Sequence, residues 1–186
     1  MERGMRRFLY YIASCGAFIA LACGTPSDDE PSGTPSPVPT PQDFAAIRDV
    51  ELASLPETET LLQRLGSGRV AEEEAFYADL TGDMRDDAVV PITSDGTLGN
   101  IAYVVYTLKA GRPSLILTRT MDRTTASGLV MDLDDFGALR ETVGIYAAED
   151  PLCCPSQLRL TTFHWDGTSL QVAGEQKVDQ PNKAKQ

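Results

Sequence analysis

A helical spacing of apolar residues begins after Pro56. Two glutamates occupy the first turn, where negative charge is favourable near the positive end of the helix dipole, and proline suits the first helical position. Gly66 can take the left-handed conformation that ends many helices. The apolar face consists of Leu61, Leu62 and Leu65. The sequence therefore predicts a short helix that ends near residue 66, whereas residues 43–55 fit either a second short helix or a strand.

After Gly68 the helical spacing gives way to short runs rich in Val, Ile, Tyr and Thr, separated by Gly, Asp and Pro. The runs are residues 74–80, 88–92, 101–108, 114–118, 129–133, 140–147, 158–165 and 169–173. Two connections, Ala110-Gly111 and Asp166-Gly167, predict hairpins, and the Asp-Gly pair favours a type I′ turn. No repeat of fixed period is present, which argues against a propeller or a solenoid. We expect an α+β, mostly β fold: a curved antiparallel sheet with one or two short helices at its amino-terminal end.

The amino-terminal segment has the features of a lipoprotein signal peptide. Three arginines precede an uncharged run over residues 8–22, which is shorter than the roughly 20 apolar residues that span a bilayer as a helix. The run ends in Ile-Ala-Leu-Ala directly before Cys23, and lipoproteins end this way because the thiol receives diacylglycerol before cleavage. We expect residues 1–22 to be removed and Cys23 to carry lipid, which anchors the protein outside the cytoplasmic membrane. An ordinary secretory signal is the alternative.

The residues after Cys23 change abruptly in composition. Residues 23–42 are dominated by Pro, Ser, Thr and acidic side chains, and such a segment buries too little apolar surface to offset the entropy of ordering it. The composition predicts a disordered, partly extended tether. Residues 43–186 then form a single β-rich globular domain, long enough to build a hydrophobic core.

The chain is acidic, with a formal net charge of −11. Residues 1–22 contain three Arg and one Glu, so their removal takes the net charge from −11 to −13. A surface of this sign repels nucleic acid and anionic lipid headgroups, and it suits cations or basic partners. We therefore expect no nucleic-acid partner and contact with the membrane through the lipid on Cys23. The sequence leaves a protein or other envelope partner open.

An acidic loop at residues 79–87 has the spacing of a calcium-binding loop. Asp79, Thr81, Asp83 and Asp87 place oxygen side chains at positions 1, 3, 5 and 9, and Arg85 supplies a backbone carbonyl at position 7. Such a loop can wrap a hard cation, and Ca²⁺ is the cofactor it suggests. The alternative is an acidic turn in which the aspartates bond nearby amides.

The same loop resembles the calcium loops of integrin-type FG-GAP repeats, whose usual form is DxNGDGxxD. Its three matching aspartates and Gly82 keep their places. Thr81 replaces a stronger ligand, and Met84 replaces the second glycine, which makes that turn harder to form. The resemblance implies a weak calcium site.

Cys153 and Cys154 are adjacent and lie between Pro151 and Pro155. With Cys15 removed and Cys23 acylated, they are the two thiols of the mature chain, and in an oxidising compartment they should form a disulfide. The pair serves either as a rigid structural turn or as a redox-labile link. Two adjacent cysteines with one histidine give neither the ligand number nor the spacing of a zinc site.

No set of residues predicts catalysis. His164 is the single histidine and lies within a predicted strand, and no Ser or Cys can be assigned to it as a nucleophile. The glycine-containing segment 94–100 lacks a lysine and a following helix, so it is a turn rather than a phosphate-binding loop.

Several segments resemble a domain of uncharacterised bacterial envelope lipoproteins, of which the group LppP/LprE is an example. The similarity runs from Tyr77 to Val172 and includes YADLTGDMRDDAVVPI, IAYVVYTL, CCPS and the later WDG. The resemblance implies an extracytoplasmic, lipid-anchored location and a β-rich fold. It brings no activity with it.

The leading hypothesis is therefore a membrane-anchored lipoprotein that acts as a non-enzymatic binding or structural module of the cell envelope. A metal-dependent envelope hydrolase that uses the loop at residues 79–87 is the first alternative. A thiol redox partner built on Cys153 and Cys154 is the second.

Overall fold

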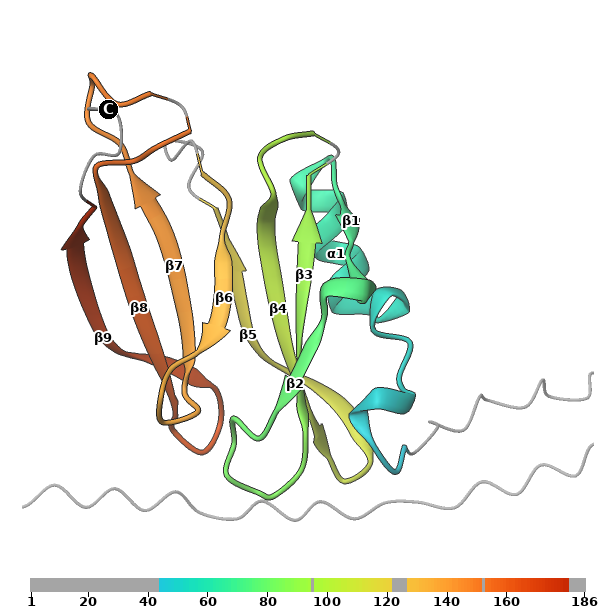
Figure 1. Ribbon diagram of the computed structural model, residues 1–186. Coiled ribbons are helices and arrows are strands. Elements are labelled where there is room, and N and C mark those ends of the chain that lie inside the picture. Colours follow the sequence, from blue (N-terminus) through green and yellow to red (C-terminus); the bar gives the residue numbers. More distant parts are fainter. Residues whose placement is uncertain (1–43, 95, 122–126, 152, 181–186) are drawn as a thin grey trace, which may run out of the picture. The chain divides into compact units, whose positions relative to one another are not determined.

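The computed structural model describes residues 44–94, 96–121, 127–151 and 153–180 (Figure 1). These residues all belong to one compact unit, and the predicted signal peptide, Cys23 and the whole of the predicted tether lie outside the described residues. The described residues form two antiparallel sheets and one α-helix, so the predicted α+β, mostly β fold class is confirmed. The strands divide between two sheets, where the sequence predicted a single curved one.

The helical part of the domain lies at its amino-terminal end. Residues 43–55, which the sequence left ambiguous, contain two 3₁₀ turns, η1 (Ile47–Asp49) and η2 (Leu52–Ser54). The predicted helix is α1 (Pro56–Leu65), with Pro56 in its first turn. The helix ends at Gly66, which takes a left-handed conformation with φ +72°. The Gly66 amide donates to Leu62 O at 3.0 Å. Local capping chemistry therefore sets both ends of this helix.

The first sheet, sheet A, has five strands in the order β1-β3-β4-β5, with β2 also pairing with β3. The strands are β1 (Arg69–Val70), β2 (Phe76–Ala78), β3 (Asp87–Thr93), β4 (Asn100–Lys109) and β5 (Arg112–Thr120). The predicted strand 74–80 is shorter than expected, because its first residue belongs to the 3₁₀ turn η3 (Glu72–Glu74). In the predicted turn between β3 and β4, Ser94 N donates to Gly99 O.

The second sheet, sheet B, has four strands in the order β6-β7-β8-β9. They are β6 (Val130–Leu133), β7 (Leu139–Ile145), β8 (Gln157–Trp165) and β9 (Leu170–Asp179). Strand β9 continues well beyond the predicted 169–173, although its last residues carry no apolar alternation. Backbone pairing with β8 over the whole of β9 extends the strand there.

The two predicted hairpins are present, with different turns. Ala110 and Gly111 form a two-residue connection between paired Lys109 and Arg112, and both have positive φ (51° and 77°), as a type I′ turn requires. The Asp166-Gly167 connection is instead four residues long, because Trp165 pairs with Leu170 across residues 166–169. The expectation of a type I′ turn at Asp166 was wrong for a physical reason. Its side chain accepts from the amides of the next residues and opens the loop.

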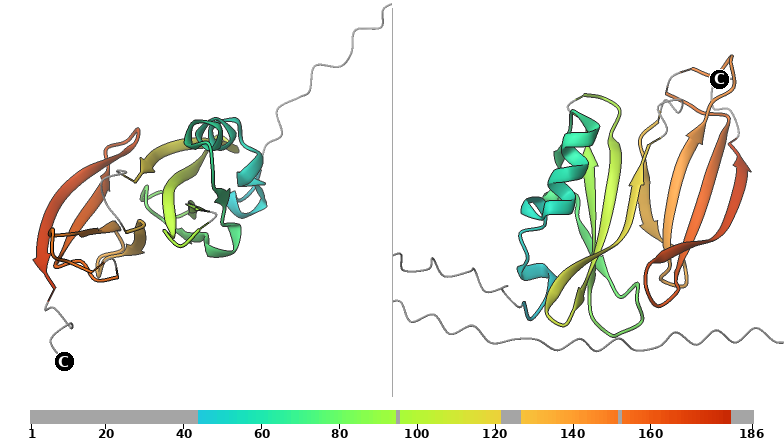
Figure 2. Two further views of the ribbon diagram at one scale, coloured as in Figure 1. Left: turned by 90° about the horizontal axis from the view of Figure 1, so that it is seen from above. Right: turned by 180° about the vertical axis from the view of Figure 1, so that it is seen from behind.

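The domain has three layers: helix, sheet A and sheet B. One core lies between α1 with its preceding turns and one face of sheet A, and a second core lies between the other face of sheet A and sheet B (Figures 1 and 2). Strands β3 and β4 are the middle of this stack, so side chains on both of their faces are buried. This explains the nearly unbroken apolar runs in their sequences. Among the described residues, no helix has the length and hydrophobicity needed to cross a membrane.

A buried ion pair joins the two sheets. Arg119 on β5 donates two hydrogen bonds to Glu141 on β7, at 2.9 and 2.8 Å, and the glutamate is 1% exposed. The guanidinium also lies over the ring of Phe163, 5.5 Å from its centroid. Burial, and then the negative charge of Glu141, raise the pKa of the neighbouring Tyr103 hydroxyl. The pair ties sheet A to sheet B, because the buried carboxylate of Glu141 needs a cationic partner once it is removed from water.

Candidate functional site

The acidic loop between β2 and β3 uses its carboxylates to hold its own backbone. Asp79 Oδ1 accepts from the amides of Gly82 and Asp83, at 2.7 and 3.1 Å, and Oδ2 accepts from Met84 N at 2.9 Å. Asp83 Oδ1 accepts from Arg85 N at 2.9 Å. These are the contacts of an acidic turn in which aspartates cap successive amides. Both oxygens of Asp79 therefore point into the loop backbone.

Asp87 lies beneath the loop and is fully buried. Its Oδ2 accepts from Leu80 N and Thr81 N, at 2.8 and 2.9 Å. Its Oδ1 and the hydroxyl of Thr81 have no hydrogen-bond partner in the structure. Burial raises the pKa of Asp87, and the Thr107 side chain and then the amides of Leu80 and Thr81 oppose that rise. Asp87 thus closes the loop from inside, whereas Asp79 and Asp83 are exposed.

The loop follows the glycine pattern of the FG-GAP form with one departure. Gly82 has φ +77°, and Met84 has φ +65° at the place of the second glycine, so a methionine occupies a left-handed conformation. Among the residues that the structure describes, no three or more Asp, Glu, His or Cys side chains are grouped to hold a metal ion. The calcium site at Asp79, Thr81, Asp83, Arg85 and Asp87 stays a prediction from the sequence. The metal-dependent hydrolase, which needs this site, stays one as well.

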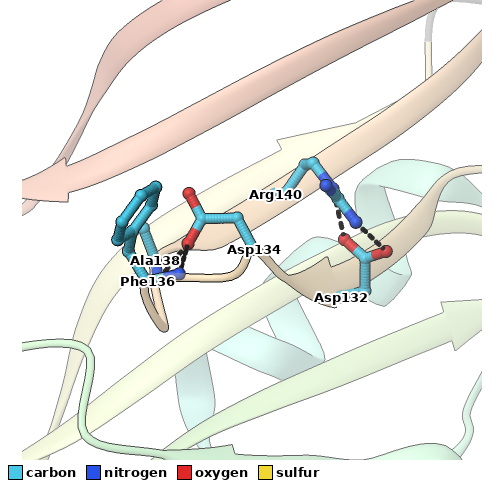
Figure 3. Close-up of polar contacts among 5 residues, drawn as sticks. All are labelled: Asp132, Asp134, Phe136, Ala138 and Arg140. Carbon is cyan, nitrogen blue, oxygen red and sulfur yellow. Dashed lines mark hydrogen bonds and ion pairs between the residues drawn. The ribbon is translucent and has the colours of Figure 1, made fainter.

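The turn between β6 and β7 presents an aromatic side chain on a rigid support (Figure 3). Asp134 Oδ1 accepts from the amides of Phe136 and Ala138, both at 2.9 Å, and Gly137 has φ +83°. Backbone bonds between Asp134 and Ala138 and from Gly137 to Asp134 close the turn. Phe136 at its tip is 95% exposed. An aromatic ring held this openly by a well-bonded turn contributes nothing to the core and is available for contact.

The base of this turn is fixed by a second ion pair. Arg140 donates to both carboxylate oxygens of Asp132, at 2.8 and 2.7 Å, across paired positions of β6 and β7 (Figure 3). The fork-to-fork geometry is the strong form of this interaction. The proximity of Asp132 raises the pKa of Arg140. The two bonded carboxylates thus hold the Phe136 turn from its tip to its base.

A groove of about 370 Å³ lies between the acidic loop, the Phe136 turn and the β8–β9 hairpin. These three connections gather at the lower end of the domain in Figure 1. Phe136, His164 and Trp165 line the groove together with Asp79 and Thr81. It is open and combines aromatic rings with oxygen-bearing groups. We call it the aromatic groove.

Trp165 is held in place by a cation from the other sheet. Lys109 Nζ lies over its indole ring, 5.3 Å from the centroid, and donates to Thr168 O at 3.3 Å. Trp165 is partly buried, and its neighbour His164 is exposed. The β8–β9 turn that follows carries Asp166, whose pKa is lowered because it accepts from the amides of Ser169 and Thr168. An ionised carboxylate therefore lies next to the groove.

The loop before β8 contains the cysteine pair. Cys153 and Cys154 are joined by a disulfide, and both residues are exposed. Asp150 Oδ2 accepts from Ala147 N and Ser156 N, both at 2.7 Å, and these bonds lower the pKa of Asp150. The disulfide is therefore displayed on a loop that a single carboxylate clamps at both ends.

Comparison with protein-family models, with curated proteins and with solved structures found no match to this chain. The similarity to envelope lipoproteins and to FG-GAP loops therefore stays an expectation from the residues.

Sequence reasoning missed the aromatic groove. The signal was present in the segment Asp134-Asp135-Phe136-Gly137, where a large aromatic residue stands between acidic residues and a glycine. A turn gives such a ring no burial, so its position called for another explanation.

Proposed function

We propose that this protein is a non-enzymatic binding module, held outside the cytoplasmic membrane of a bacterium by lipid on Cys23, and that it binds its partner in the aromatic groove. The observation that carries the proposal is Phe136, a 95% exposed ring on a turn whose amides are capped by Asp134. Exposed, preorganised aromatic residues are typical anchors of binding sites, because little side-chain entropy is lost when they are covered.

A positively charged polypeptide segment is the partner that fits the groove. The exposed ring of Phe136 offers its faces to Lys or Arg side chains, and Lys109 already makes this kind of contact with the partly buried Trp165. Asp134 and Asp166 lie in the turns that flank the groove, and the chain carries a net charge of −11. Negative turns around aromatic faces attract a basic segment and repel an acidic one.

The carboxylates with lowered pKa support a binding role. Asp150 and Asp166 are each stabilised in the ionised form by backbone amides that they hold in place. A carboxylate fixed in this way serves as a constant charge and a turn clamp. It is poorly suited to exchange protons with a substrate near neutral pH.

Trp165 is the only tryptophan of the chain, so its fluorescence reports directly on the groove. The experiment titrates residues 40–186 with a hexa-arginine peptide, a hexa-glutamate peptide and an uncharged oligosaccharide. We expect a saturable change with hexa-arginine alone. Phe136→Ala should weaken that affinity about tenfold or more, as for an interface anchor, and Phe136→Tyr should retain it.

Met84→Ala is the matched control, because Met84 is 93% exposed and lies in the neighbouring loop, outside the lining of the groove. It should bind hexa-arginine like the unchanged protein. If Phe136→Ala bound hexa-arginine as tightly as the unchanged protein and Met84→Ala do, the peptide would be held by the acidic surface in general, and the assignment of the groove would be overturned. Binding of the oligosaccharide in place of hexa-arginine would overturn the assignment of a basic partner.

A further inference from the structure

Strand β9 is an open edge of sheet B. It pairs with β8 on one side from Leu170 to Asp179, and no strand among the described residues pairs with its other side (Figure 1). All of its residues after Leu170 are exposed. A long open edge presents unpaired backbone groups that another strand can use.

The register identifies which backbone groups point outward. Gln180 N donates to Ser156 O at 2.7 Å, and this bond continues the β8–β9 register, in which Asp179 pairs with Gln157. Backbone groups alternate in direction along a strand, so those of Glu175, Lys177 and Asp179 point away from β8. The open edge is therefore a ladder built on these odd-numbered positions.

The charges of Glu175 and Lys177 favour one register for the pairing of two β9 edges. In an antiparallel pair related by a two-fold axis at Gln176, Glu175 lies opposite Lys177 of the second copy, and the reverse pair follows by symmetry. An axis at Glu175 would place Glu175 opposite Glu175 of the second copy. An axis at Lys177 would place Lys177 opposite Lys177 of the second copy. Only the first register among these pairs opposite charges.

The surroundings of Lys177 favour the same register. Its cross-strand neighbour on β8 is Arg159, which is also positive, so an acidic side chain from the open side is the complementary neighbour. On the alternate face of the strand the register sets Val178 opposite Gly174 of the second copy. A Cβ built on Gly174 would meet no atom within 4 Å, so there is room for a valine.

We propose that two copies of this protein associate through β9 in this register and form one continuous sheet across the two-fold axis. Each copy contributes the same strand, so the contact closes on itself and gives a dimer. A lysine in an edge strand ordinarily deters pairing, and here the glutamate two residues earlier makes the pairing self-complementary.

Sedimentation equilibrium of residues 40–186 over micromolar concentrations tests the proposal. We expect a reversible dimer. Glu175→Lys and Lys177→Glu should each raise its dissociation constant about tenfold or more, because each places like charges in both symmetry-related pairs. The double variant Glu175→Lys/Lys177→Glu should restore the original value to within about threefold.

Glu72→Lys on the 3₁₀ turn η3 makes the same charge change away from β9 and should leave the dimer intact. All substituted side chains are exposed, so circular dichroism should show an unchanged fold. A monomer at every concentration overturns the proposal. Single variants that dimerise normally, or a double variant that stays monomeric, overturn it as well.

Discussion

Replacing Arg119 by methionine tests whether the buried ion pair holds the two sheets together. Methionine keeps an unbranched apolar chain beside Phe163 but removes both hydrogen bonds to Glu141. The glutamate side chain is 1% exposed, so its carboxylate would be left with little access to water. The perturbation is therefore the creation of an unpaired buried charge.

The size of the effect follows from the exposure of the two partners. Removal of one partner from a buried ion pair typically costs about 3–5 kcal/mol. The Arg119 side chain is 33% exposed, so water can partly reach the site and the lower figure applies. We expect a loss of about 3 kcal/mol, which for a domain of this size is a fall in Tm of roughly 10 °C.

Urea unfolding followed by Trp165 fluorescence measures the loss. With a slope of about 2 kcal/mol per molar, the midpoint should fall by about 1.5 M. In the double variant Arg119→Met/Glu141→Leu the unpaired charge is gone, and an apolar pair of similar volume is often about as stable as the ion pair. It should therefore lie within about 1 kcal/mol of the unchanged protein.

The single and double variants together test whether Glu141 depends on its charged partner. If Arg119→Met leaves the midpoint within about 0.3 M of the unchanged protein, the glutamate does not depend on its partner. If the double variant is less stable than Arg119→Met, packing and not charge pairing governs this position. Either result would refute the role assigned to the pair.

Three further predictions test the loop, the turn and the anchor. Burial raises the pKa of Asp87, so the ionised side chain lowers the stability of the fold at neutral pH. That loss disappears as the pH falls through the raised pKa. The unchanged protein should therefore gain stability relative to Asp87→Asn between pH 7 and about pH 4, and urea midpoints at each pH would show the gain. Asp134→Ala removes the acceptor of two turn amides and should cost about 1 kcal/mol in a thermal melt, while Asp134→Asn retains most of that stability. Cys23→Ser should move the protein from the membrane fraction to the soluble fraction on cell fractionation, and unchanged membrane association would contradict the lipid anchor.

The elements that could be predicted from the sequence are those set by local chemistry. Pro56 and Gly66 fix the ends of α1 through the first-turn proline and the left-handed cap, and neither depends on distant residues. The strand runs were found for the same reason, since turn residues separate them. Ala110-Gly111 also formed the expected two-residue turn.

The division into two sheets depends on partners that no local pattern names. Strands β3 and β4 are apolar on both faces because helix and sheet B cover sheet A from opposite sides. A single half-exposed sheet would instead show alternation of apolar and polar residues, so the unbroken apolar runs already indicated a middle layer. Conversely, the second half of β9 lacks alternation because both of its faces are exposed, and the pattern ended the strand too early.

The candidate site was missed because it is built from turns and not from a motif. The loop at residues 79–87 attracted attention through its spacing, yet spacing alone does not decide whether a carboxylate faces an ion or an amide. In the structure Asp79 gives both oxygens to loop amides, and Asp134 does the same with one oxygen beneath Phe136. Because these aspartates are bonded to turn amides, the exposed ring of Phe136 is the group that they leave available for contact.

The aromatic groove and the β9 edge lie on different parts of the domain, so both proposed contacts can form at once. The three connections that line the aromatic groove lie at one end of the domain, whereas β9 forms the open edge of sheet B (Figures 1 and 2). Pairing through β9 would leave the aromatic groove of each copy uncovered, because the groove is lined from β9 by Leu170 alone and the paired positions lie beyond it. Two grooves on one continuous sheet, with each copy anchored by the proposed lipid on Cys23, would raise the local concentration of binding sites for a partner with two basic segments. The charge-swapped single variants should therefore weaken binding of a tandem basic peptide while leaving the affinity for hexa-arginine unchanged.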